Sequence, residues 1–76
     1  MIEQTVESSM IQKVGYDEVH HQLYITFHNG SCYVYFQVPK SIYDGLIAAE
    51  SAGKYFVGEV KQNFVYRNVT NLQEKK

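Results

Sequence analysis

The sequence has little of the chemistry that usually marks a metal site, a disulfide-bonded protein or a membrane protein. It contains one cysteine, one proline and no tryptophan in 76 residues. A lone cysteine cannot close a disulfide within the chain, and no Cys/His spacing matches that of structural zinc. No run approaches the ~18 apolar residues of a membrane span, and residues 1–10 lack the apolar core of a secretory signal. We therefore expect a cytoplasmic protein that does not enter a membrane.

The chain is short, which limits it to a single domain. At this length roughly 60% of the unfolded surface can be buried, enough for one core. We expect one domain over residues 1–76, with an ordered core from about 8 to 70 and loose termini.

The net charge of −1 is unevenly spread: residues 1–50 hold two lysines against six acidic residues, and residues 51–76 hold five basic residues against two acidic ones. This spread favours either a local positive patch or an ordinary solvated surface with a basic tail.

One segment of the sequence indicates a β-hairpin. Residues 22–28 and 31–37 are rich in β-branched and aromatic residues, and the pair Asn29-Gly30 separates them. Both residues of this pair tolerate positive φ, so the pattern predicts a two-residue type I′ turn whose twist matches that of the strands.

That turn sets the register and sorts the side chains onto two faces of the hairpin. It pairs Phe27 with Cys32 and Ile25 with Val34, and side chains then alternate between the faces along each strand. The predicted core face carries Leu23, Ile25, Phe27, Cys32, Val34 and Phe36. The opposite face, here named the predicted tyrosine face, carries Tyr24, Thr26, His28, Ser31, Tyr33 and Tyr35.

A further strand is expected before the hairpin. Residues 8–16 are long enough to pair antiparallel with residues 22–28. Ile11 and Val14 are out of step for strict alternation, which predicts a bulge near residues 13–15.

Two helices are expected after the hairpin, over residues 39–50 and 51–63. Apolar residues recur there at intervals of three and four, and Pro39 suits the first helical turn because its missing N–H is not needed. Residues 64–70 are rich in β-formers and are a candidate fourth strand. The segment after them is expected to be loose.

These elements predict an α+β fold in two layers, with an antiparallel meander of three strands, and the candidate fourth, packed against two helices. The order of the elements leaves open which face of the sheet the helices cover. Two helices on one face would leave the predicted tyrosine face exposed, whereas one helix on each face would bury it.

A succession of short motifs extends over residues 8–69. It consists of Ser8-Ser9, Gly15-Tyr16-Asp17, Leu23 with Phe27, Gly30, Tyr33-Val34-Tyr35, Val38-Pro39, Tyr43, Ala49 with Ser51 and Gly53, Tyr55-Phe56, and Phe64 to Tyr66. This succession resembles the KTSC domain family, which is named for the C-terminal region of some lysyl-tRNA synthetases. The association with a tRNA synthetase implies RNA as a partner. Where the family often has arginine this chain has Lys61, which contacts a phosphate as a point charge and not as a bidentate fork.

The predicted tyrosine face is the best candidate for a binding surface. Tyr24, Tyr33 and Tyr35 would present flat rings on a rigid sheet, where RNA bases can stack. Three basic residues would contact phosphates beside them: Lys54, Lys61 and Arg67. The pI near 6.3 is low for a dedicated nucleic-acid domain. The alternative is therefore a protein–protein interaction module, or a homodimer, that uses the sheet edge or the tyrosine patch.

No group of residues predicts catalysis, a metal or a cofactor. His20 and His21 are adjacent in a loop, where neighbouring side chains diverge, so these residues and His28 are expected to be exposed and free of metal. Cys32 is expected to be a small buried residue of the core face, without a histidine or aspartate to activate it. The acidic residues show no paired spacing for acid–base chemistry. We therefore expect a small non-enzymatic binding module.

Overall fold

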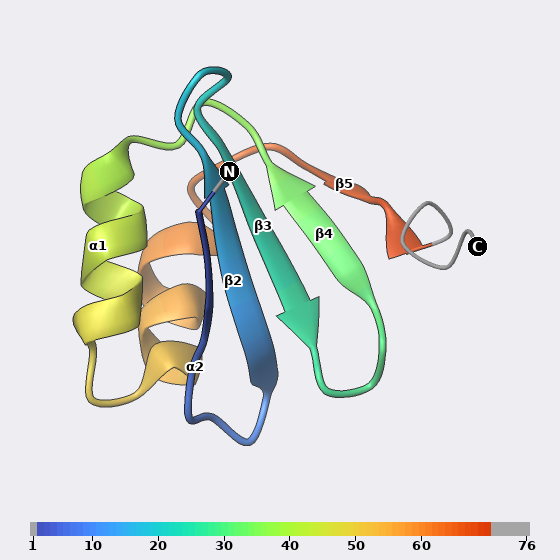
Figure 1. Ribbon diagram of the computed structural model, residues 1–76, viewed down its shortest axis with the longest axis vertical. Coiled ribbons are helices and arrows are strands. Elements are labelled where there is room, and N and C mark those ends of the chain that lie inside the picture. The colour runs from blue at the N-terminus through green and yellow to red at the C-terminus, as the bar shows by residue number, and fades with distance from the viewer. Residues whose placement is uncertain (1, 71–76) are drawn as a thin grey trace.

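The computed structural model describes residues 2–70 as a five-stranded antiparallel sheet with helices packed on one of its faces (Figure 1). The strands lie in chain order across the sheet: β1 (Ile2–Thr5), β2 (Ile11–Asp17), β3 (Gln22–Phe27), β4 (Cys32–Tyr35) and β5 (Tyr66–Asn68). The helices are α1 (Lys40–Ala48) and α2 (Ala52–Tyr55), and α2 continues into a π-helical turn, η1 (Phe56–Val60). The predicted two-layer α+β fold is confirmed. The segment expected to be loose after residue 70 lies outside the described residues.

The sheet is wider than the predicted meander by one strand at each edge. β5 confirms the candidate fourth strand and pairs antiparallel with β4. β1 pairs with β2 in a segment that was expected to be loose, and all four of its residues are exposed. An edge strand of this kind is held by backbone hydrogen bonds to its neighbour, so its sequence needs no apolar alternation. That is why the sequence pattern did not reveal it.

β2 contains a bulge close to the predicted position. Its register with β3 shifts between Ile11 and Lys13, at the start of the strand. A bulge inserts one extra residue and thereby resets the alternation of side chains. Ile11 and Val14 consequently lie on the same face of the sheet, and both are fully buried.

The β3–β4 hairpin exists as predicted, but its register differs by one residue. The loop has three residues and not two: the Phe27 N–H donates to the Ser31 carbonyl at 2.9 Å, and the Gly30 N–H donates to the Phe27 carbonyl at 3.0 Å. Gly30 has φ of 95°, the left-handed residue that follows a type I turn in such loops. The Asn29 side chain accepts a hydrogen bond from the Ser31 N–H at 2.9 Å, which stabilises this longer loop.

The shifted register overturns the predicted composition of both faces. Ile25 now lies opposite Tyr33, and Tyr24 lies opposite Val34. Since side chains alternate, a shift of one residue moves every side chain of β4 to the other face. Tyr33 and Tyr35 therefore lie on the helix side of the sheet, while Tyr24 lies on the opposite side. The predicted tyrosine face, with all three rings together, does not exist.

The opposite side of the sheet carries a small apolar cluster of its own. It consists of Cys32, Val34 and Val69, with Tyr24 and Phe36 packed against them. We call it the opposite-face cluster. Cys32 is buried as expected, but on this side and not beside Phe27 as the two-residue turn required.

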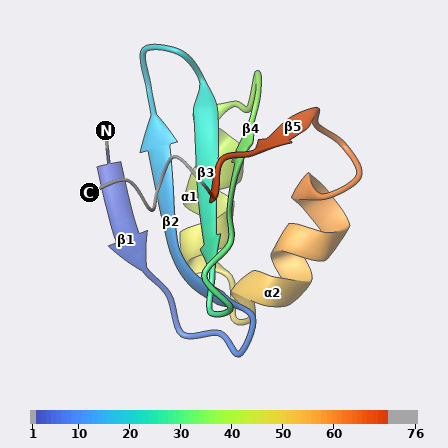
Figure 2. The same cartoon turned by 90° about the vertical axis from the view of Figure 1, so that its right-hand side faces the viewer.

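The main core lies between the sheet and the helices. Both helices cover the same face of the sheet, as Figure 2 shows from a second direction. The buried side chains of this core include Ile11, Val14, Tyr16, Leu23, Ile25, Tyr35, Val38, Tyr43, Leu46, Phe56 and Val60. Tyr16 anchors one end of it, because its hydroxyl donates to the Val38 carbonyl and its ring stacks on Tyr43. Within residues 2–70, none of the helices has the length and apolar character to cross a membrane.

The two helices approach each other closely at a glycine. A Cβ built at Gly45 of α1 would lie only 2.7 Å from Cζ of Tyr55 in α2, and still nearer the hydroxyl of that ring. Glycine at this position therefore lets the Tyr55 ring lie directly against the α1 backbone.

Replacing Gly45 with alanine is expected to lower the free energy of unfolding by about 1 kcal/mol, because the clash with Tyr55 outweighs the better helix propensity of alanine. Gly58 is the matched control, since a Cβ there meets no atom within 4 Å. Gly58→Ala is expected to raise the stability by roughly 0.5–1 kcal/mol. Urea denaturation of both variants measures the difference, and equal stabilities would contradict the tight contact.

Candidate functional site

Five aromatic rings meet on the helix side of the sheet and form a closed circuit of contacts, here named the aromatic cluster. The neighbouring centroids are Phe27–Tyr33 at 5.7 Å, Tyr33–Tyr66 at 5.3 Å, Tyr66–Tyr35 at 5.5 Å, Tyr35–Phe56 at 5.6 Å and Phe56–Phe27 at 5.5 Å. These separations lie in the range of edge-to-face and offset aromatic pairs, so each ring supports the next.

Three strands and one helix supply these rings. Tyr33 and Tyr35 alternate along β4 and so point to the same side of the sheet. The register of β5 places Tyr66 opposite Tyr35. Phe27 ends β3, and Phe56 begins η1 beneath the sheet.

Burial increases from the rim of the aromatic cluster to its floor. Tyr66 is 54% exposed, and Phe27 and Tyr33 are half-buried, whereas Tyr35 and Phe56 are each only 3% exposed. Burial, with smaller contributions from Tyr66 and Tyr33, raises the pKa of Tyr35 to about 12. The Tyr35 phenol therefore stays neutral throughout the physiological range.

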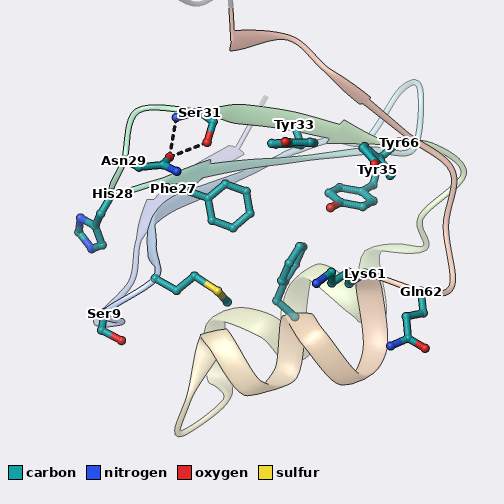
Figure 3. Close-up of a pocket in the computed structure, with 12 residues that line it drawn as sticks. Ser9, Phe27, His28, Asn29, Ser31, Tyr33, Tyr35, Lys61, Gln62 and Tyr66 are labelled. Carbon is teal, nitrogen blue, oxygen red and sulfur yellow. Dashed lines mark hydrogen bonds between the residues drawn. The ribbon is translucent and has the colours of Figure 1, made fainter.

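The aromatic cluster forms one wall of an open cleft of about 740 Å³ between the sheet and the second helix. Figure 3 shows Tyr33, Tyr35 and Tyr66 along the sheet, with Lys61 and Gln62 at one end of the cleft. The other residues that line the cleft are Ser9, Met10, Phe27, His28, Asn29, Ser31 and Phe56. The cleft thus combines a wide aromatic surface with polar groups at both ends.

The polar end of the cleft farthest from Lys61 is held by two loops that contact each other. His28 Nε2 lies 2.8 Å from the Ser8 carbonyl, which can only accept, so Nε2 carries the proton and donates. Asn29 Oδ1 accepts from both the N–H and the hydroxyl of Ser31. The Asn29 amide group keeps its two donors for other partners.

A π-helical turn brings Lys61 to the cleft. The Lys61 N–H donates to the Phe56 carbonyl at 2.9 Å, a bond that spans five residues. In a regular α-helix residue i+5 would be rotated by about 140° from residue i. The wider turn instead places Lys61 one turn beyond Phe56, so both residues line the cleft. Single π-helical turns of this kind are frequent at functional sites.

The structure brings together three of the six residues that the sequence suggested for binding. Tyr33, Tyr35 and Lys61 all line the cleft. The other three lie elsewhere, so the expectation of a single surface with all six is wrong.

Tyr24, Lys54 and Arg67 are each placed away from the cleft. Tyr24 belongs to the opposite-face cluster, and its hydroxyl donates to Gln22 Oε1 at 3.1 Å. Lys54 borders a separate hollow between α2 and the β1–β2 loop. Arg67 lies opposite Val34, so alternation directs it to the other side of the sheet from Tyr66.

Sequence reasoning missed most of the aromatic cluster. Tyr66 could have been found by pairing the candidate strand of residues 64–70 with β4, because its ring then falls beside Tyr35. Phe27 and Phe56 carried an apolar signal that indicates core positions equally well. No pattern in the sequence distinguishes a ring that lines a cleft from a ring that is fully covered.

The remaining polar residues do not form a metal site within the described part of the chain. No group of three or more His, Cys, Asp or Glu side chains there could hold an ion. His20 and His21 are exposed loop residues as expected, and so is His28. His20 Nδ1 contacts Asp17 Oδ2 at 2.8 Å, and this hydrogen bond is the main reason that the pKa of Asp17 is lowered.

These features define a small α+β domain with an aromatic cleft between its sheet and its second helix. Residues 7–64 match the KTSC domain, and the chain belongs to this family. The resemblance inferred from the sequence motifs is thereby confirmed.

Relatives in three organisms show in what kinds of protein the domain occurs. The chain is 44% identical over 61 residues to a protein of Tsukamurella paurometabola, covering 80% of this chain and 91% of that one. It is 34% identical over 64 residues to the lysine–tRNA ligase of Nostoc punctiforme, covering 84% of this chain but 11% of the ligase. The crystal structure of a KTSC domain protein from Yersinia pestis gives a TM-score of 0.84 at 34% identity, covering 88% of this chain and 94% of that chain. The domain thus occurs in small proteins and as a minor part of a large enzyme.

Alkaline pH is expected to destabilise the fold partly through Tyr35. Its pKa of about 12 in the folded chain exceeds the ordinary tyrosine value of 10.0, so its contribution to stability is complete below pH 10 and is lost as the pH rises toward 12. Tyr35→Phe has no phenol to ionise and should therefore lose less stability over this interval than the unchanged protein. Denaturant unfolding at a series of pH values measures this, and parallel losses in the two proteins would contradict the assignment.

Proposed function

We propose that this KTSC domain is a non-enzymatic module that binds single-stranded RNA in the aromatic cleft. The observation that carries the proposal is the aromatic cluster itself, with its exposed Tyr66 and half-buried Tyr33 beside the cation of Lys61. Flat rings held on a sheet are the usual platform for unpaired bases, each worth about 1–3 kcal/mol of stacking. The ammonium group of Lys61 would contact a backbone phosphate next to the stacked base.

The charge of the cleft supports an anionic ligand. None of the twelve residues that line it is an aspartate or a glutamate, although the chain has eight such residues. A cationic ligand, which aromatic cages also bind, would meet Lys61 without an opposing carboxylate. A nucleotide has both a flat base that can stack on the aromatic wall and a phosphate that can contact the positive charge.

The polar groups at the far end of the cleft support recognition of base edges. Asn29, with its free amide donors, and His28 line the same cleft as Tyr33, where the base would stack. Side-chain amides pair well with the exposed edges of bases. The kinship with a lysine–tRNA ligase, whose name includes tRNA, agrees with an RNA partner.

A purely binding role also fits the position of the lone thiol. Cys32 is buried in the opposite-face cluster, on the other side of the sheet from the cleft. A nucleophile must be reachable by its substrate, and no orienting base is near this thiol among its cluster neighbours.

The second candidate is a protein-interaction module, and the sheet edges favour it. β1 and β5 are exposed edge strands, and Val65 next to β5 is 73% exposed. Edge strands with free backbone groups readily pair with another chain, including a second copy. Light scattering over a range of concentrations tests this candidate. A dimer would support it, and a monomer at all concentrations would rule out a homodimer.

Tyr33→Ala is expected to weaken RNA binding about 5-fold to 150-fold, which corresponds to the loss of one stacked base. Tyr24→Ala is the matched control, because it removes the same side chain from the opposite side of the sheet. Tyr33→Phe should bind nearly as well as the unchanged protein, since stacking does not need the hydroxyl.

Fluorescence anisotropy with labelled mixed-sequence single-stranded RNA at low salt measures these affinities, and circular dichroism checks that each variant is folded. Equal affinities of Tyr33→Ala and Tyr24→Ala would show that RNA does not bind in the cleft. The absence of binding by the unchanged protein would reject the proposed function.

A further inference from the structure

Among residues 2–70, the lysine and arginine side chains are distributed so that a single one of them lines the cleft. Two of the other described lysines already face acids: Lys13 Nζ lies 3.9 Å from Glu3 Oε1, and Lys40 Nζ lies 3.1 Å from Asp44 Oδ1. Lys61 is the one basic residue, histidine aside, among the side chains that line the cleft. An RNA strand that crosses the cleft would therefore have one of its phosphates contacted by a lysine there.

The remaining lysine and arginine of residues 2–70, Lys54 and Arg67, cannot extend that contact along the cleft. Lys54 borders the separate hollow together with Glu7 and Glu50, which make that surface acidic overall. Arg67 extends from the opposite side of the sheet, away from Tyr66. Proteins that follow a nucleic-acid backbone over several nucleotides instead present a continuous positive groove.

The aromatic surface offers room for few bases. Tyr35 and Phe56 are almost fully buried, so the open ring surface comes from Tyr66 and from the half-buried Tyr33 and Phe27. The Tyr33 ring lies 5.3 Å from Tyr66 and 5.7 Å from Phe27, which is direct contact on both sides, so no base can enter between neighbouring rings. A base must instead lie against them from the cleft.

The ends of the cleft limit its length. The loop end is fixed by the contact between His28 and the Ser8 carbonyl at 2.8 Å, and Lys61 and Gln62 stand at the other end. The volume of about 740 Å³ falls within the roughly 300–1,000 Å³ typical of sites for one small molecule.

From these observations we infer that the cleft recognises a single nucleotide unit of RNA, a terminal or unpaired base with its adjoining phosphate, and not a continuous strand. The inference rests on the proposed RNA-binding function and specifies its ligand. The base lies against Tyr33 and Tyr66, and the phosphate contacts Lys61.

The test is a titration of the full isotope-labelled chain, followed by NMR, with a nucleoside monophosphate, a dinucleotide and single strands of increasing length. For strands longer than the dinucleotide, the binding constant divided by the number of nucleotides at which the protein can bind is expected to change less than about threefold. The logarithm of the binding constant should fall with the logarithm of salt concentration with a slope of about −0.7, the value for one phosphate on a single strand. Amide shifts should centre on β4, β5 and residue 61.

Two lysine variants provide matched controls. Lys61→Ala should bring the salt slope close to zero, whereas Lys54→Ala should leave it unchanged. An affinity that rises with each added nucleotide, or a slope near −2 or steeper, would overturn the single-nucleotide footprint while leaving RNA binding in place. If no RNA of any length shifts the spectrum, the proposed function itself fails.

Discussion

The hydrogen bonds that close the β3–β4 loop determine where the aromatic residues of this domain lie. The Phe27 N–H bonds to the Ser31 carbonyl, the Gly30 N–H bonds to the Phe27 carbonyl, and Gly30 takes up the left-handed conformation that this loop needs. One residue fewer in the loop would turn every side chain of β4 to the other face. The cleft would then lose Tyr33 and Tyr35 together.

The rest of the site follows from that register and from two further constraints. β5 pairs with β4 so that Tyr66 joins the rings already there, and the close packing of Tyr55 on Gly45 brings the second helix against α1. The π-helical turn then directs Lys61 toward the rings. Together these contacts produce an aromatic wall with one cation at its end.

Much of the fold could be predicted because it depends on local patterns. The alternation in residues 22–28 and 31–37, and the three-and-four spacing after Pro39, depend only on whether a residue faces the core. The bulge of β2 was visible because Ile11 and Val14 are both apolar at the wrong interval. The loop length was not, since Asn29-Gly30 is compatible with a two-residue turn and with a three-residue loop that ends in glycine. The helical pattern likewise does not separate an α-helical from a π-helical turn.

By itself, the sequence determined the family, the α+β class, the hairpin, the helices and the absence of any catalytic or metal-binding pattern among its motifs, because these features depend on residue type and short-range spacing. Tertiary structure alone decided which rings share a face, that Tyr24 and Arg67 lie away from Lys61, and that a cleft exists at all. The physical reason is that a cleft is made by side chains distant in the chain. Their meeting depends on strand register and helix packing, which residue types favour only weakly.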